Sequence, residues 1–203
     1  MHMSLTRSQL AVLLFSLLYI LPFSFYYISI KDFEFLWYIA VLLLFLLLVL
    51  FTVHKTHFTP LILWGLSLWG LLHMAGGGVP VADGVLYSYK LIDIVGNGES
   101  AILKFDQAVH AFGFAVATLV AHHLMAPRWV PNASRTLLYI GAALIGMGLG
   151  AVNEIVEFIA VVTFPETGVG GYFNTALDLV FNTLGAVAAA IFLALKNKNT
   201  IRN

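Results

Sequence analysis

Residues 35–51 read FLWYIAVLLLFLLLVLF, an unbroken apolar run of seventeen residues. A run of this length is long enough for a helix that crosses the hydrocarbon core of a membrane. Trp37 and Tyr38 stand near its start, and aromatic rings there suit the headgroup boundary. The whole chain agrees with this stretch, because 61% of its 203 residues are apolar and only 10% are charged, against about 25% in a soluble domain. The sequence therefore predicts an all-α integral membrane protein.

Hydropathy and flanking charges divide the chain into six apolar segments. We expect about six transmembrane helices in a single polytopic membrane domain, residues 1–203, with spans at about 9–30, 34–53, 58–75, 106–125, 136–162 and 177–195. The first segment is too long for the apolar region of a cleaved signal peptide, so we expect it to be the first span.

Basic residues predict the orientation of these spans, because cytoplasmic loops carry an excess of Lys and Arg. With the N-terminus inside, seven basic residues lie on the cytoplasmic side and three outside: Arg7, Lys55, Arg128, Arg135, Lys196, Lys198 and Arg202 against Lys31, Lys90 and Lys104. We therefore expect both the N- and the C-terminus to be cytoplasmic, with the loops 76–105 and 163–176 on the outer face.

Charge and cysteine content exclude several classes of function. The formal net charge is zero, with ten basic and ten acidic residues, so we expect membrane lipids and no nucleic acid as partners. The chain has no cysteine, which excludes disulfides, thiolate metal ligands and cysteine nucleophiles. It also has no H-E-x-x-H, G-x-S-x-G or Walker motif.

Six ionisable side chains lie in or at the ends of the last four predicted spans: His73, Asp106, His110, Glu154, Glu157 and Asp178. Each charge at bilayer depth opposes insertion by roughly 2.5–3.5 kcal/mol, so such residues indicate function. We expect His73 to close the third span and Asp178 to open the sixth. In the predicted orientation all six then lie within roughly 12 Å of the outer boundary, at about 1.5 Å per helical residue.

Helical spacing places these groups on faces that also carry small residues. Pairs four residues apart project from one side of a helix: Asp106 and His110, Asn153 and Glu157, Asp178 and Asn182. Small residues extend these stripes: Gly113, Ala117 and Ala121; Ala142, Gly146 and Gly150; Gly185 and Ala189. Membrane helices approach each other closely at small residues four apart. We therefore expect the polar groups to lie on packed faces and to converge.

Two interpretations of this polar layer remain open: a buried hydrogen-bonding network and a functional site. The network would merely hold spans 3 to 6 together. Against it stand the four acidic groups, which repel one another in one layer. Such crowding calls for a bound cation, protonated carboxyl groups or access of water.

The polar residues form an ordered series of motifs: His73-Met-Ala-Gly-Gly, Tyr87-Ser-Tyr89, Asp106-x-x-x-His110-x-x-Gly113-Phe114, Asn153-Glu154-x-x-Glu157-Phe158 and Tyr172-x-Asn-Thr-x-x-Asp178-Leu-x-x-Asn182-x-x-Gly185-Ala. Across about residues 60–190 this series resembles the YjdF-like family of small bacterial inner-membrane proteins and, more distantly, the VanZ-like proteins. The resemblance implies a multi-pass location in the bacterial inner (plasma) membrane. YjdF-like proteins have no established biochemical activity, and the VanZ-like link implies at most a cell-envelope or glycopeptide-resistance role.

An enzyme is one functional interpretation of the layer. The predicted metal ligands are His73, His110, Glu154, Glu157 and Asp178, a mixture of imidazole and carboxylate that fits Zn, Mn or Fe. The predicted catalytic acid–base residues are Glu154, Glu157, His110 and Asp106. With a divalent metal ion as cofactor, the site would suit a metal-assisted hydrolase or transferase acting on a lipid or envelope precursor.

Two other functions remain as alternatives. A non-catalytic lipid-binding or scaffold protein needs none of this chemistry, and no residue is identified as a nucleophile. A proton- or cation-coupled transporter is less favoured, because the six spans show no inverted repeat and Gly and Ala fill the inner half of the polar faces.

Overall fold

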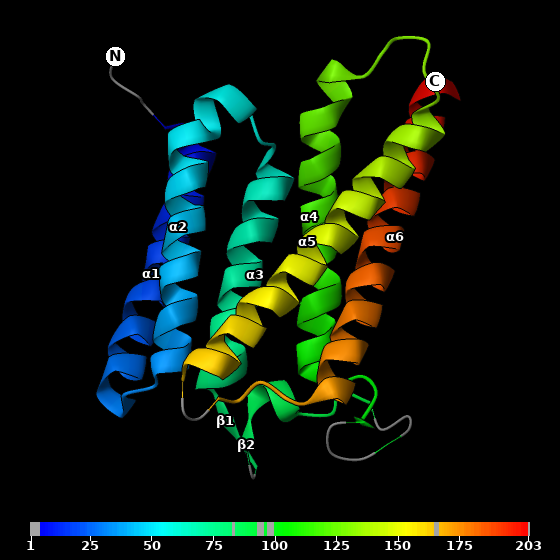
Figure 1. The fold of residues 1–203 in the computed structure, drawn as a ribbon. Coiled ribbons are helices and arrows are strands. Elements are labelled where there is room, and N and C mark those ends of the chain that lie inside the picture. The colour runs from blue at the N-terminus through cyan, green and yellow to red at the C-terminus, as the bar shows by residue number, and fades with distance from the viewer. Residues whose placement is uncertain (1–4, 83, 93–95, 97–99, 165–166, 203) are drawn as a thin grey trace. The chain divides into compact units, whose positions relative to one another are not determined.

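The computed structural model describes residues 5–82, 84–92, 96, 100–164 and 167–202. It contains six helices that are long and apolar enough to cross a membrane (Figure 1). The predicted all-α membrane fold with six spans is thereby confirmed. The orientation of the spans and the single polytopic domain stay predictions.

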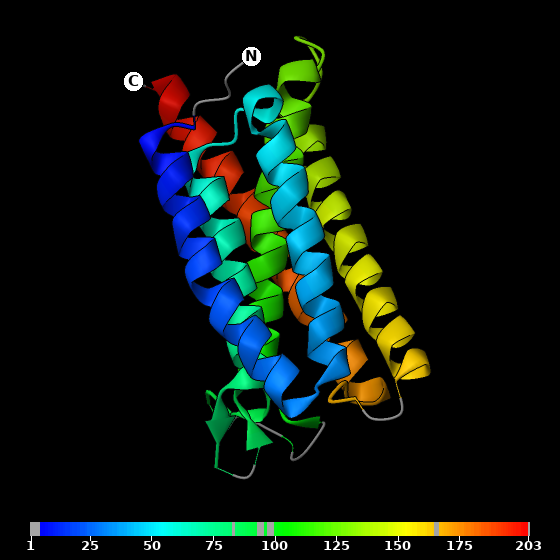
Figure 2. The same ribbon diagram turned by 90° about the vertical axis from the view of Figure 1, so that its left-hand side faces the viewer.

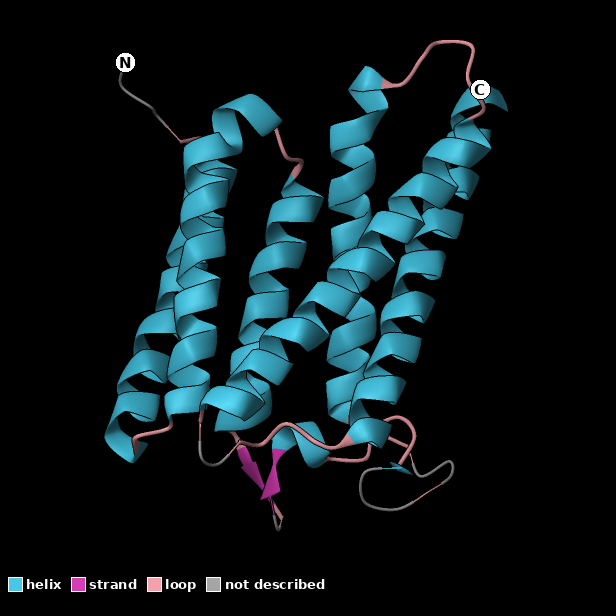
Figure 3. Ribbon diagram, in the orientation of Figure 1, coloured by secondary structure: helices cyan, strands magenta, loops and turns pink. Residues whose placement is uncertain are grey.

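The helices are α1 (Arg7–Ile30), α2 (Phe33–Thr56), α3 (Pro60–Gly78), α4 (Phe105–Met125), α5 (Arg135–Thr163) and α6 (Tyr172–Arg202). Between α3 and α4 lie β1 (Pro80–Val81), β2 (Gly84–Val85) and the 3-10 helix η1 (Leu86–Ser88), and a second 3-10 helix, η3 (Ala126–Arg128), follows α4. β1 and β2 form an antiparallel pair (Figure 3). The first five predicted spans end within three residues of these bounds, whereas α6 is longer than predicted at both ends.

The chain divides into two compact units. The first comprises Met1–Tyr89 and Ala160–Gly168, and so contains α1, α2, α3, the hairpin and the last turn of α5. The second comprises Lys90–Ile159 and Val169–Asn203, and so contains α4, most of α5, and α6.

In the first unit α3 packs against both α1 and α2 (Figure 2). The hydroxyl oxygens of Ser16 on α1 and Ser67 on α3 are 2.6 Å apart. The Tyr27 hydroxyl donates a hydrogen bond of 2.6 Å to the carbonyl of Met74. Both contacts join uncharged groups and satisfy them inside the unit, as is usual where helices meet in a membrane.

Large apolar side chains cover the outer faces of α1 and α2. Leu18 and Phe25 on α1 are each 73% exposed, and Phe51 on α2 is 66% exposed. A continuous exposed apolar surface is unfavourable in water. These faces therefore suit contact with lipid acyl chains.

α3 runs five residues past His73, to Gly78, so His73 does not close the helix as predicted. Two aromatic rings pack directly on the glycines of this extra turn. A β-carbon at Gly76 would overlap the ring of Tyr87, and one at Gly77 would overlap the ring of Phe35. The helix continues here because the missing side chains leave room for these rings.

In the second unit α4 and α6 run side by side, and α5 crosses them obliquely (Figure 1). Glycines mark the closest approaches. A β-carbon at Gly185 on α6 would overlap the backbone carbonyl of Ala111 on α4, and one at Gly146 on α5 would overlap the Thr118 hydroxyl on α4. The predicted packing at small residues is thus confirmed for both glycines.

The first turn of α4 is fixed by Gln107, which is fully buried. Its Oε1 accepts the backbone N–H groups of Leu103 at 2.5 Å and Lys104 at 3.1 Å, and its amide donates to the carbonyl of Ala101 at 2.9 Å. These bonds satisfy backbone donors that a helix start leaves unpaired. They also hold Lys104 at the start of the helix that carries Asp106 and His110.

α6 begins at Tyr172, so Asp178 lies in its second turn and does not open the helix as predicted. Hydropathy alone places the start near residue 177, because the preceding residues are more polar. The added turn contains Asn174, whose side-chain amide donates to Asp178 at 2.6 Å. This bond links the first turn of α6 to the second.

Candidate functional site

Five of the six predicted ionisable residues converge in the second unit: Asp106 and His110 from α4, Glu154 and Glu157 from α5, and Asp178 from α6. We refer to these five residues as the His110 cluster. Asp178 is fully buried, and His110 and Glu154 are 6% and 8% exposed. The predicted convergence is confirmed for these five side chains, whereas their chemical roles stay predictions.

The imidazole of His110 lies at the centre of the cluster. Its Nε2 is 3.6 Å from Oδ1 of Asp106 and 4.0 Å from Oε1 of Glu157. Its Nδ1 is 3.6 Å from Oε1 of Glu154 and forms a hydrogen bond of 2.9 Å with Oδ1 of Asn182. Both ring nitrogens therefore face oxygen atoms, but at different distances.

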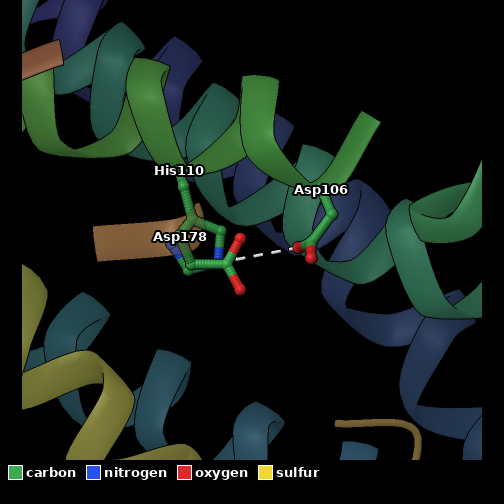
Figure 4. A group of neighbouring side chains, drawn as sticks. All are labelled: Asp106, His110 and Asp178. Atoms are coloured by element: carbon green, nitrogen blue, oxygen red, sulfur yellow. Dashed lines mark ion pairs between the residues drawn. The ribbon is translucent and has the colours of Figure 1, made fainter. Parts of the chain in front are cut away.

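Two groups of potential ligand atoms share His110. In each group, one atom per residue lies within 4.8 Å of the others: Asp106, His110 and Asp178 in one, and His110, Glu154 and Glu157 in the other. Figure 4 shows the first group, with a dashed line for the ion pair between His110 and Asp106. The cluster thus offers two sets of potential ligands, each with one imidazole and two carboxylates, that share His110.

Asparagine amides surround the carboxylates. Asn153 donates to Glu157 at 2.7 Å, and Asn182 approaches Glu154 at 3.5 Å. Asn174 donates to Asp178 at 2.6 Å and lies 3.4 Å from Asp106. Each carboxylate therefore has an amide donor beside one of its oxygens, and these neutral donors orient the carboxylates without balancing their charge.

Lys104 brings a positive charge close to the cluster. It is only 8% exposed, and its Nζ donates a hydrogen bond of 2.6 Å to Oδ1 of Asn174. Because an ammonium group can only donate, this bond directs the amide nitrogen of Asn174 toward Asp178 and Asp106. Lys104 thus acts on two carboxylates through one asparagine.

Two buried carboxylate oxygens in the cluster, Oε2 of Glu154 and Oδ1 of Asp178, have no hydrogen-bond donor among the described residues. Most buried polar atoms in proteins have a partner, so an unpaired buried carboxylate oxygen requires an explanation. Asp178 belongs to the first ligand group and Glu154 to the second. They are suitable donor atoms for a cation.

The charges within the cluster are not balanced when the carboxylates are ionised. Four carboxylates face His110 and Lys104, the two groups nearby that can carry positive charge. At the 4.8 Å limit that joins Asp106 to Asp178 and Glu154 to Glu157, one pair of like charges repels by on the order of 3 kcal/mol at an effective dielectric constant of about 20. A divalent cation would remove this repulsion and pair the free oxygens.

The mixture of imidazole and carboxylate ligands fits a transition-metal ion better than Ca²⁺ or Mg²⁺. Imidazole suits Zn, Cu, Fe and Ni, whereas all-oxygen sites suit Mg, Ca and Mn. A single imidazole among carboxylates is compatible with Zn, Mn or Fe. The residues present therefore fit the divalent metal that the sequence suggested.

A family model described as a predicted membrane protein (DUF2238) matches residues 11–199. The chain belongs to the DUF2238 family. The match runs from residue 11 in α1 to residue 199 in α6 and covers all five residues of the His110 cluster. No curated protein and no solved structure matches the chain.

Membership of the DUF2238 family establishes a polytopic membrane protein, and the His110 cluster is a feature of this member's own structure. The family description names no activity. The chemistry of the cluster must therefore be argued from its geometry.

The sixth predicted residue, His73, belongs to the first unit of this DUF2238 member. Its Nδ1 shares a short hydrogen bond with the hydroxyl of Tyr87, and its ring meets the ring of Tyr38 edge-on, with centroids 5.3 Å apart. These contacts account for a half-buried histidine within an aromatic group. Its role as a metal ligand stays a prediction.

Sequence reasoning missed Glu34, a buried acid in the first unit. Glu34 is 7% exposed, and its Oε2 accepts the backbone N–H of Gly168 at 2.6 Å. It stands one residue before the long apolar run, where an acid is easily assigned to the interface. Its partner is 134 residues away in the sequence, so no local pattern reveals the contact.

Proposed function

We propose that the His110 cluster binds a divalent transition-metal ion and that the protein is a metal-assisted hydrolase or transferase of the membrane. The observation that carries this proposal is that one buried oxygen each of Glu154 and Asp178, within a group of four carboxylates, has no donor among the described residues. A purely structural network would be expected to pair these oxygens.

The proposed ligands come from five residues: His110, Asp106, Asp178, Glu154 and Glu157. Metal binding would determine which of them coordinate the ion. A bound metal ion would supply a Lewis acid and an activated water molecule. A carboxylate of the cluster that is not bound to the metal would accept a proton from that water. Glu154 and Glu157 are the candidates for this base, because α5 carries both within one turn.

The proposed substrate is a lipid or a precursor of the cell envelope. In support, the cluster lies on three helices that are each long and apolar enough to cross a membrane. The distribution of basic residues favours an outward-facing site. The resemblance to YjdF-like and VanZ-like proteins supports a bacterial inner membrane and a role in the envelope.

A non-catalytic scaffold is the second candidate function, and the asparagine contacts are the observation that favours it. Asn182 on α6 forms a hydrogen bond of 2.9 Å with His110 on α4 and lies 3.5 Å from Glu154 on α5. A network of this kind would hold α4, α5 and α6 together without any metal. It leaves one buried oxygen each of Glu154 and Asp178 without a donor among the described residues.

Metal analysis of the purified protein separates the two candidates. We expect about one equivalent of Zn, Mn or Fe after purification in detergent without chelators, and a loss of thermal stability when a chelator removes it. A metal-free protein whose stability does not change on adding Zn²⁺, Mn²⁺ or Fe²⁺ would instead favour the scaffold.

Reporter fusions test the proposed orientation. We expect cytoplasmic signals from fusions at the C-terminus and in the loop between η3 and α5, because seven of ten basic residues lie on that side. A periplasmic signal from either position would move the site to the inner leaflet.

A further inference from the structure

The two ring nitrogens of His110 differ in what surrounds them. Nδ1 lies 2.9 Å from Oδ1 of Asn182, which is the length of a direct hydrogen bond. Nε2 lies 3.6 Å from Asp106 and 4.0 Å from Glu157, both too long for one. Two ligands at about 2.0–2.2 Å from a tetrahedral ion are about 3.4 Å apart. The distances around Nε2 are therefore close to those between ligands of a shared ion.

The position of Asn182 determines which nitrogen carries the proton. An ionised carboxylate can only accept hydrogen bonds, so Glu154 attracts the amide nitrogen of Asn182, which lies 3.5 Å from its Oε1. The amide oxygen then points toward His110. Because an amide oxygen can only accept, Nδ1 must be the nitrogen that bears hydrogen.

Oε1 of Glu154 lies 3.6 Å from Nδ1, as far as Oδ1 of Asp106 lies from Nε2, so the 2.9 Å bond to Asn182 is what distinguishes the two nitrogens. A neutral imidazole has one N–H group and one lone pair. With hydrogen on Nδ1, the lone pair of His110 is on Nε2 and faces Asp106 and Glu157.

We infer that His110 binds the cation through Nε2 and that Asn182 is the positioning residue that enforces this choice by accepting a hydrogen bond from Nδ1. The inference rests on the proposed binding of a cation to the His110 cluster. It specifies the ligand nitrogen of His110 and gives Asn182 a defined role. Histidine ligands of metals generally donate their second ring N–H to such an acceptor.

Close packing holds Asn182 in place. It is 1% exposed, and a β-carbon at Gly150 on α5 would lie 2.8 Å from its amide nitrogen. The side chain therefore has little room to move. Changing Asn182 should alter the tautomer of His110 without removing any carboxylate.

The test is nitrogen NMR of the full-length protein, labelled with ¹⁵N-histidine in detergent and loaded with ¹¹³Cd²⁺. The His110→Gln variant identifies the signals of His110. We expect coupling to ¹¹³Cd at Nε2, while Nδ1 keeps its hydrogen. Coupling at Nδ1 would overturn the inference alone. A parent protein that binds no Cd²⁺, Zn²⁺, Mn²⁺ or Fe²⁺ would overturn the proposed function as well.

Three variants separate positioning from general structure. Asn182→Leu removes the acceptor and should weaken Cd²⁺ binding by about 10–100-fold, as changes to second-shell partners typically do. Asn182→Asp keeps an acceptor, so hydrogen should stay on Nδ1. Asn197 lies on α6 like Asn182, and Asn197→Leu removes a 2.7 Å bond to the Tyr139 hydroxyl on α5, so this variant should leave Cd²⁺ affinity unchanged. Equal losses from the two leucine variants, or hydrogen moving from Nδ1 in Asn182→Asp, would contradict the role of Asn182.

Discussion

The two units of this protein bury different kinds of polar group. In the first, Ser16, Ser67 and Tyr27 form contacts in which every partner is uncharged. In the second, four carboxylates surround one histidine. Neutral hydroxyl contacts are complete within the protein, whereas an ionised carboxylate group needs positive charge to balance it. The comparison supports our proposal that the second unit, and not the first, binds a cation.

Glu34 shows why a buried acid alone does not indicate a site. It lies in the first unit, and its Oε2 is paired with the backbone N–H of Gly168. In contrast, Glu154 and Asp178 each retain a buried oxygen without a donor among the residues that the structure describes. The crowding of acids and their unpaired oxygens distinguish the His110 cluster.

The largest effect is expected from Gly185→Leu, because the backbones of α4 and α6 approach each other directly at this glycine. Its new side chain would meet the backbone carbonyl of Ala111, which cannot move aside as a flexible side chain could. Overpacking usually costs about 1–3 kcal/mol, and we expect at least the upper end here. Thermal unfolding in detergent measures the loss, together with metal binding.

Gly148→Leu is the matched control for this prediction. Gly148 lies on α5, and a β-carbon there would have nothing within 4 Å. We expect unfolding like that of the parent, or slightly higher stability because leucine favours helix more than glycine does. Equal destabilisation by both variants would show that the second unit does not depend on the close approach of α4 and α6.

The next effect concerns the stabilisation of the second unit by metal. Asp178→Asn keeps an acceptor for the Asn174 amide but removes one negative charge and one ligand. At a free metal concentration about 100-fold above Kd, the parent should gain about 2.7 kcal/mol of stability. The variant should gain much less, while its metal-free form should be at least as stable as the metal-free parent. Unfolding with and without Zn²⁺ measures the stability of both proteins. A gain in the variant as large as the gain in the parent would contradict the assignment of Asp178 as a metal ligand.

The smallest effect is expected from Ser67→Ala in the first unit. The change removes the hydroxyl contact with Ser16, while Ser16 can still donate to the carbonyl of Val12 at 2.9 Å. Hydrogen bonds between membrane helices contribute about 0.6 kcal/mol on average. We expect a loss of that size in unfolding experiments and no change in metal affinity. A large loss of metal binding would contradict the division of roles between the units.

The sequence predicts the six spans well because long apolar runs dominate the energetics of insertion. It also predicts five members of the His110 cluster, because residues four apart share a helix face and small residues mark the packed side. The start of α6 is less visible, since Asn174 lies in a polar stretch and gains its helical position from contacts with Asp178 and Lys104.

The sequence could identify only some of the residues that support the His110 cluster. Asn174 lies four residues before Asp178, a spacing that places both on one face and could have identified it. The sequence places Lys104 in the outer loop 76–105. Its contact with Asn174 joins residues 70 positions apart. Contacts of that kind depend on how helices pack, and hydropathy does not report packing.

A cation-binding measurement on two matched histidine variants tests the central claim most directly. His110 and His122 lie on the same helix, but His122 stacks on the ring of Tyr139 at a centroid distance of 5.7 Å. Calorimetric titration of the purified protein with Zn²⁺ and Mn²⁺ should give one bound ion for the parent and for His122→Gln. For His110→Gln we predict a loss of affinity beyond the roughly 10–100-fold of a second-shell change. Equal affinity in all three proteins, or no binding by the parent, would contradict a metal centre at His110.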